Sequence, residues 1–329
     1  MRHAPMASIR GAYVIAPGLY RSMTPITIPG MLGYPEKEIH HYLDTGEYDH
    51  SLSAWPAGDY VARSTLAHDA LRQALVRAVR KRTEHAVEPE ALLGVDVVAL
   101  TRAKVAPMVR GLFPRSEQQA VLEVLGRSVI FLKPSNIDAI LGETRWHGTA
   151  WALANLYLVS VGAEPLADDA PRIVGLSEET TCYVSMEYFR PNGRFEDFIV
   201  HEAAHIFHNC KRGTIGLRQT RRREWLLHLE FKKRETFAHA CEAYNRILED
   251  GVGPVDRRRL LDELEDGPTP PTDRVDLDEY VDILREAVVA RNGWKHILAR
   301  CSPPRTHTPA RARGAVRGDL ARCPGRKKG

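Results

Sequence analysis

Two histidines spaced four residues apart, with a glutamate directly after the first, are the feature that most constrains this chain. They occur in the sequence His201-Glu202-Ala203-Ala204-His205. Residues four positions apart lie on one face of an α-helix, so the two imidazoles would converge on one point. This spacing is typical of helices that bind zinc through both histidines while the glutamate acts on a metal-bound water. Because the motif is short, the surrounding sequence has to decide whether this interpretation holds.

The sequence around the motif predicts a strand followed by a helix. Residues 181–189 are rich in β-branched and aromatic side chains and favour a strand, and the turn-forming residues 190–193 end it. Over residues 195–207 the apolar side chains recur at helical spacing, with Glu196 and Asp197 where a helix dipole favours acids. No proline interrupts this segment, so we expect both histidines on one unbroken helix.

The two histidines do not complete a metal site. A catalytic zinc ion needs three protein ligands and an open position for water, whereas a structural site is closed by four. His208 lies on the same predicted face, but three imidazoles in consecutive turns would be nearly collinear and would suit tetrahedral coordination poorly. The longer H-E-x-x-H-x-x-G-x-x-H pattern is absent, because His208 stands in place of its glycine and Lys211 in place of its last histidine.

A better candidate for the third ligand lies about thirty residues downstream, in a second predicted helix. This helix carries the pattern Glu-x-Phe-Ala-x-Ala, which begins at Glu235. With the first motif, the pattern resembles the zinc helices of the gluzincin metallopeptidases, especially the branch that includes anthrax lethal factor and the Mlc titration factor peptidases. The resemblance covers residues 197–248. It implies that Glu235 joins His201 and His205 in holding a Zn²⁺ ion, and that Glu202 is the general base.

The second helix also allows other ligand assignments. Its polar face carries Glu235, His239 and Glu242, a pattern that an ordinary surface helix would also show. A carboxylate that faces a metal, followed by polar neighbours, would give the same pattern turned toward a cleft. His239 and Glu242 therefore remain alternative ligands.

The residue that would stabilise a developing oxyanion is less clearly marked. The related families tend to carry a tyrosine seven residues before the glutamate ligand, and that position is His228 here. A protonated or suitably tautomerised His228 would donate a hydrogen bond in the same way. Otherwise His228 is an ordinary residue of a helix face. Tyr244, Tyr183 and His239 are the other candidates.

The resemblance implies an α+β fold of the zincin type, with a mixed β-sheet, a backing helix, two zinc-binding helices and a helical C-terminal extension. Apolar runs predict strands over 95–100, 129–132 and 173–176, and helices over 117–125 and 146–161. We expect four parts: an irregular arm with a helix over 1–89, a catalytic domain over 90–250, the helical extension over 251–301 and a basic, disordered tail over 302–329.

The expected substrate follows from the same resemblance. In the related folds the strand before the first zinc helix lies at the edge of the sheet and pairs with an extended peptide. Residues 181–189 are expected in that place, with simple core packing as the alternative. The sequence therefore predicts a zinc-dependent peptidase, a hydrolase whose substrate is a polypeptide.

Composition limits the setting in which such a protein would work. The chain is 43% hydrophobic and 27% charged, and its apolar stretches are too short to cross a membrane, so no membrane partner is expected. The N-terminal segment has no continuous hydrophobic run for export. Five cysteines without a close C-x-x-C pair favour a reducing compartment over a disulfide framework. We therefore expect a cytoplasmic protein.

Positive charge is concentrated in two segments. Residues 302–329 carry eight lysines and arginines against one aspartate, and residues 211–234 carry nine against two glutamates, a net charge of +7 in each. Either segment could attract an acidic partner or a nucleic acid, although solvated loops would show the same charge. The alternative function is therefore a nucleic-acid-associated protein, for example of a mobile element, in which the H-E-x-x-H helix is structural or non-catalytic.

Overall fold

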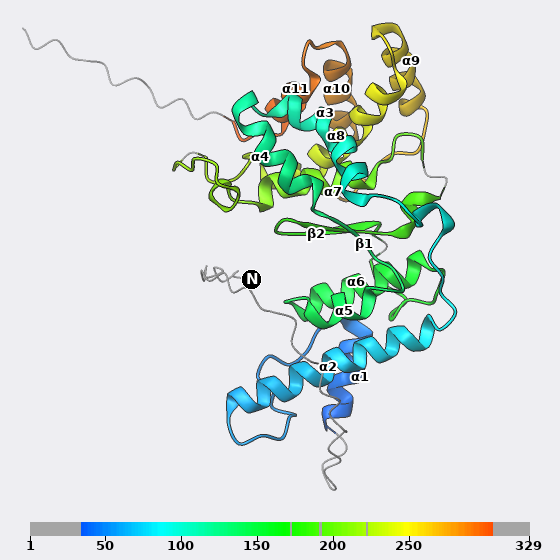
Figure 1. The fold of residues 1–329 in the computed structure, drawn as a ribbon, viewed down its shortest axis with the longest axis vertical. Coiled ribbons are helices and arrows are strands. Elements are labelled where there is room, and N and C mark those ends of the chain that lie inside the picture. The colour runs from blue at the N-terminus through cyan, green and yellow to red at the C-terminus, as the bar shows by residue number, and fades with distance from the viewer. Residues whose placement is uncertain (1–33, 172, 191–192, 222, 305–329) are drawn as a thin grey trace, which may run out of the picture.

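The computed structural model describes residues 34–304 except 172, 191–192 and 222. Within these residues the chain forms eleven α-helices and a small mixed sheet (Figure 1), as expected for an α+β protein. Residues 1–33 of the expected N-terminal part and residues 305–329 of the expected basic tail lie outside the described residues, whereas residues 34–45 of the expected irregular arm form a helix. The helices are α1 Tyr34–Thr45, α2 Tyr60–Arg82, α3 Val97–Leu112, α4 Arg115–Gly126, α5 Ile137–Glu143, α6 His147–Ser160, α7 Phe198–Asn209, α8 Arg234–Asp250, α9 Pro254–Glu265, α10 Leu277–Val289 and α11 Gly293–Cys301.

The sheet has three strands in the order β1-β3-β2. They are β1 Val129–Phe131, β2 Gly175–Glu178 and β3 Thr181–Val184. β1 runs parallel to β3, and β2 runs antiparallel to it, so that Ile130 and Leu176 both pair with Tyr183. A tight connection at Glu179, whose φ is 51°, folds β2 and β3 into a hairpin.

The prediction that residues 181–189 form an edge strand is wrong. Only Thr181–Val184 is a strand, and it is the central one because β1 occupies its other side. Residues Met186–Phe189 form a 3₁₀-helix whose first turn is capped by Ser185, since its hydroxyl accepts a hydrogen bond from the amide of Glu187. The free edge beside α7 belongs to β2 instead.

The strand predicted over residues 95–100 is also wrong, because this segment begins helix α3. Asp96 caps the helix by accepting a hydrogen bond from the amide of Ala99 at 3.0 Å. The apolar run continues at helical spacing through Val105, Met108 and Leu112, all of which are buried. A short apolar run does not distinguish a strand from a buried helix, and here the capping residue decides.

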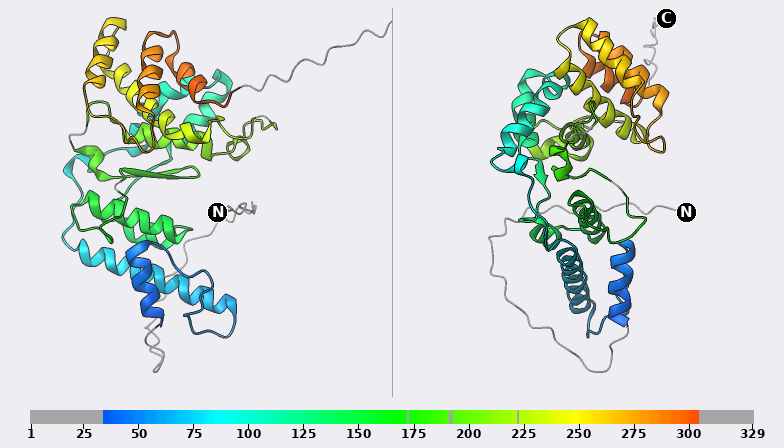
Figure 2. Two further views of the ribbon diagram at one scale, coloured as in Figure 1. Left: turned by 180° about the vertical axis from the view of Figure 1, so that it is seen from behind. Right: turned by 90° about the vertical axis from the view of Figure 1, so that its right-hand side faces the viewer.

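The sheet lies between two groups of helices. In Figures 1 and 2, helices α7 and α8 with α3, α4 and α9–α11 lie on one side, and α1, α2, α5 and α6 lie on the other. α7 contacts both β2 and β3, so the first predicted zinc helix packs directly on the sheet. Helix α6, which was predicted over residues 146–161, is buried on nearly all of its faces.

The C-terminal helices share the core of α3 and α8. The ring of Trp294 on α11 packs edge-on against Tyr244 of α8, with 4.9 Å between the ring centroids. Trp294 also occupies the space that a side chain at Gly111 of α3 would need. Four cysteines, Cys182, Cys210, Cys241 and Cys301, are buried free thiols. Across the described part of the chain, none of the helices has the length and apolarity needed to span a bilayer.

Candidate metal centre

Helix α7 is anchored so that its two motif histidines face α8. Asp197 caps the helix by accepting a hydrogen bond from the amide of Val200, and Lys104 of α3 holds the buried Asp197 carboxylate at 3.0 Å. Ala203 and Phe207 of α7 are fully buried on the core side. His201 and His205 remain on the side where α8 crosses.

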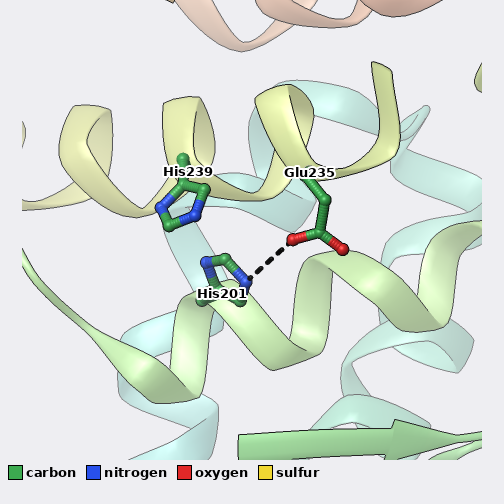
Figure 3. A group of neighbouring side chains, drawn as sticks. All are labelled: His201, Glu235 and His239. Atoms are coloured by element: carbon green, nitrogen blue, oxygen red, sulfur yellow. Dashed lines mark ion pairs between the residues drawn. The ribbon is translucent and has the colours of Figure 1, made fainter. Parts of the chain in front are cut away.

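The structure brings the three predicted ligands together. His201 Nε2 lies 3.8 Å from Glu235 Oε2, and His205 Nε2 lies 3.8 Å from Glu235 Oε1. The Nε2 atoms of the two histidines are 3.2 Å apart. Figure 3 shows Glu235 and His239 one turn apart on α8, with both side chains directed toward His201 on α7.

These distances suit one divalent cation. Two imidazole nitrogens bound tetrahedrally to zinc at about 2.0–2.1 Å lie roughly 3.3 Å apart, close to the separation of His201 and His205. A small inward movement of Glu235 would complete a three-ligand site. His201, Glu235 and His239 also offer ligand atoms that all lie within 4.8 Å of one another, so His239 borders the same space. The donor set of imidazoles and a carboxylate is one that zinc prefers.

Glu242 supports the histidines from behind. Its Oε2 atom lies 3.1 Å from Nδ1 of His201 and 3.3 Å from Nδ1 of His239, and its Oε1 accepts the amide hydrogen of Asp197 at 2.6 Å. A carboxylate at Nδ1 keeps the proton on that nitrogen and leaves the Nε2 lone pair free for a metal. Glu242 therefore has the place of an orienting residue, whereas Glu235 faces the imidazole Nε2 atoms.

The charges at the site favour a cation between the helices. Burial works against a charged His201, but its hydrogen bond to Glu242 and the nearby carboxylates outweigh burial and raise its pKa to about 9. Burial, followed by the positive charge of His201, holds the pKa of His205 well below its ordinary value. Burial also opposes the charge on Glu242, yet hydrogen bonds from His201 and His239 lower its pKa to about 2. Without a metal the pair thus holds one positive charge, on His201, and a bound divalent cation would displace the proton from Nε2 of that ring.

Glu202 is buried and held against the edge strand. The Ser177 hydroxyl of β2 donates to Glu202 Oε2 at 2.5 Å. Gly175 leaves the necessary room, because a Cβ atom there would lie 2.6 Å from Cγ of Glu202. Burial raises the pKa of Glu202, and the positive charge of His201 only partly offsets this effect. A carboxylate with a raised pKa is suited to accept and return a proton.

A cavity of about 580 Å³ opens onto these residues. The side chains of His201, Glu202 and Glu235 line it, and so does the stretch around β2. Its remaining walls come from the start of α7, from α8 and from the segment between α9 and α10. The lining residues outside the motifs include Ile173, Val174, Gly175, Leu176, Ser177, Phe195, Phe198, Pro268, Thr269, Pro270, Pro271, Arg274 and Tyr280.

Most oxyanion candidates named from the sequence lie elsewhere. His228 is exposed and lies outside the residues that line the cavity. Tyr183 pairs within the sheet, and Tyr244 packs on Trp294. His239 does line the cavity, and so does Tyr280 of α10, which the sequence did not indicate.

His208 is not placed as a ligand either. Its ring packs against that of His205, with 5.3 Å between centroids, but it lies outside the residues that line the cavity. Burial, with the positive charge of Arg234, lowers its pKa to about 4.

The basic segment between the two helices is partly neutralised by acidic side chains. Arg212 is buried and contacts Glu117 of α4 at 2.5 Å, and Arg223 lies 3.6 Å from the same carboxylate. Lys211 pairs with Glu224 at 2.7 Å. None of the described basic residues of 211–234 lines the cavity.

Comparison with known proteins identifies no further residue of the candidate site. No protein family, no curated protein and no solved structure matches the chain. The candidate site is therefore defined by the geometry of α7, α8 and β2.

Proposed function

We propose that the protein is a zinc-dependent metallopeptidase of the gluzincin type. The observation that carries the proposal is the convergence of His201, His205 and Glu235 from two helices, beside the buried carboxylate of Glu202, in an open cavity. A zinc ion held by the three ligands would lower the pKa of a water molecule and polarise a carbonyl group. Glu202 would accept a proton from the attacking water and return it to the leaving amine, and the hydrogen bond from Ser177 would orient its carboxylate.

The substrate we propose is an extended polypeptide bound along β2. This strand has a free edge, and the cavity is lined by Ile173, Val174 and the first three residues of β2. An extended chain can add to such an edge through main-chain hydrogen bonds. The peptide-binding strand is thus assigned to residues 173–177 in place of 181–189.

Tyr280 is the residue we assign to the developing oxyanion. It lines the cavity, is only 4% exposed and carries a phenolic O–H. Burial, with the negative charge of Glu242, raises its pKa well above the ordinary value, so the donor proton is retained at neutral pH. His239 is less suited, because its Nδ1 faces Glu242 and its Nε2 then presents a lone pair.

The proposal is tested by metal content and cleavage together. The purified protein should bind one zinc ion per chain and cleave an unfolded test protein. Glu202→Gln should keep the zinc and lose activity by about 10²- to 10⁴-fold, since it removes only the general base. His205→Ala should lose both zinc and activity. Equal cleavage by Glu202→Gln and the parent would refute the assignment of the base.

A nucleic-acid-associated protein with a non-catalytic H-E-x-x-H helix is the second candidate. It depends on the basic segments 211–234 and 302–329 as partners for nucleic acid or another acidic molecule. The ion pairs of Lys211, Arg212 and Arg223 weaken this proposal for the first segment. Salt-dependent retention on DNA by a protein that neither binds zinc nor cleaves polypeptides would favour it.

A further inference from the structure

One wall of the cavity carries a single guanidinium. Arg274 lies in the segment between α9 and α10 and is the only lysine or arginine among the described residues that line the cavity. Apart from Glu196, the other ionisable groups of the lining belong to the candidate metal centre or to Tyr280. Arg274 thus stands apart from the groups that the proposed mechanism uses.

The guanidinium is available to a ligand. Its ion-pair partner among the described residues is the neighbouring Asp273, at 3.7 Å, and the Asp273 side chain is 75% exposed. An exposed pair at this distance contributes little and is easily exchanged for another partner. The remaining donors of Arg274 can therefore face a molecule in the cavity.

The segment that carries Arg274 is fixed in place. The amides of Arg274 and Val275 both donate to the carbonyl oxygen of Pro271, at 3.2 and 3.1 Å. Val275 is buried, and Asp276 caps α10 by accepting a hydrogen bond from the amide of Glu279. Three nearby prolines restrict the backbone further. The backbone that carries Arg274 is thus held by hydrogen bonds and packing, which reduces the entropy that binding of a specific group would cost.

We propose that Arg274 binds a carboxylate of the polypeptide substrate and makes the enzyme selective for it. This inference rests on the proposed function. Arginine pairs with carboxylates through two parallel hydrogen bonds between opposite charges. A neutral amide cannot form such a charged pair. The carboxylate belongs either to an acidic side chain or to the C-terminus of the substrate, since both offer the same chemistry.

Peptide pools separate these two sources. The zinc-loaded full chain is given degenerate octapeptides that contain Asp in one pool and Asn in the other, each with a free or an amidated C-terminus. We expect the parent to cleave at least one carboxylate-bearing pool about tenfold to hundredfold faster than its neutral counterpart. Selectivity between Asp and Asn indicates a side chain, and selectivity between free and amidated ends indicates the C-terminus.

Two variants of Arg274 test whether this residue causes the selectivity. Arg274→Gln should bring the ratio of the two rates to about one, and Arg274→Glu should favour a pool with Lys in place of Asp. The control is Arg259→Gln on α9, which removes an exposed arginine that pairs with Glu263 outside the cavity and should keep the parental ratio. A parent without selectivity, or an Arg274→Gln variant that retains it, would overturn the inference.

A binding measurement keeps this test separate from the peptidase proposal. The zinc-loaded Glu202→Gln variant should bind the preferred pool more tightly than its neutral counterpart, and the added Arg274→Gln change should remove the difference. Selective binding without cleavage by the parent would support the carboxylate site and overturn the peptidase. Cleavage by the parent with equal binding of all pools would support the peptidase and overturn the carboxylate site.

Discussion

One carboxylate oxygen of Glu242 contacts the imidazoles of two histidines. Oε2 of Glu242 lies within 3.3 Å of Nδ1 in both His201 and His239, while Oε1 accepts the amide of Asp197 at the start of α7. The residue thereby connects α8 to the N-terminus of α7 and favours a proton on Nδ1 of His201, the first of the proposed zinc ligands.

Glu242→Gln is therefore expected to weaken zinc binding about tenfold to hundredfold, because the neutral amide no longer favours the Nδ1–H tautomer of His201. Competition with a chromophoric chelator measures the affinity. The control is Glu286→Gln, which changes a glutamate that pairs with His296 and Arg300 away from the cavity. Unaltered affinity in Glu242→Gln would show that this carboxylate does not orient the ligand.

Tyr280→Phe is expected to lower kcat about 10²- to 10³-fold while leaving zinc content unchanged, because it removes only the hydrogen bond to the oxyanion. Tyr244→Phe is the matched control, since this tyrosine is also buried on the C-terminal side but packs on Trp294 outside the cavity. Similar losses of kcat in the two variants would point to a general packing defect instead.

Among the residues of the candidate site, the sequence predicted those that belong to a short motif. His201, His205 and Glu235 follow from helical spacing and from a resemblance of two short patterns, and the structure brings them together. Ser177 and Tyr280 reach the site only because β2 and α10 fold against α7 and α8. No spacing along the chain encodes such contacts, which arise from tertiary packing.

Among the elements, strongly periodic helices were predicted best and short apolar segments worst. The helices over 117–125 and 146–161 are found as α4 and α6. The segment 95–100 begins α3, because the Asp96 cap and the periodicity beyond it outweigh local β-propensity. The order of strands in the sheet could not be predicted, since the pairing of β1 with β3 joins residues about fifty positions apart.

Helix α6 carries a buried histidine that should make stability depend on pH. His147 at its first turn packs against His68 and Tyr48 and is 4% exposed. Burial, then the positive charges of Arg72 and His68, lowers its pKa to about 4. The unfolded chain binds a proton at this imidazole near pH 6.5, whereas the folded chain does not until about pH 4. Stability contributed by the neutral ring is therefore present above pH 6.5 and is lost as the pH falls through this window.

The expected loss is roughly 2 kcal/mol in the free energy of unfolding between pH 7.5 and 5. Urea unfolding at the two pH values measures it. His147→Gln should have a smaller pH dependence than the parent, whereas His296→Gln, in the ion pair with Glu286 on the C-terminal helices, should behave as the parent does. An identical pH dependence in His147→Gln and the parent would contradict the assignment.

For the whole molecule, the candidate site joins helices that share one core. α7 and α8 carry the proposed ligands, and α8 also packs against α9, α10 and α11, which form the upper part of the molecule in Figure 1. A metal ion that binds only the folded arrangement should therefore raise the free energy of unfolding of the protein.

Zinc at about a hundred times its dissociation constant should add about 2.7 kcal/mol and raise Tm by roughly 4–5 °C. Thermal unfolding with zinc and with a chelator measures the shift, and His205→Ala, which lacks a ligand, should show little of it. An equal shift in both proteins would place the stabilising ion elsewhere.

The wall formed by Pro268, Pro270 and Pro271 bears on what happens after a bond is cut. Proline has no backbone N–H, so this side of the cavity cannot form a second hydrogen-bonded ladder with an extended chain. The main-chain hydrogen bonds would come from β2, and Arg274 would bind a carboxylate. After cleavage, the fragment without that carboxylate would keep only its share of the hydrogen bonds to β2. We expect this fragment to dissociate readily, which would limit inhibition of the proposed peptidase by that product.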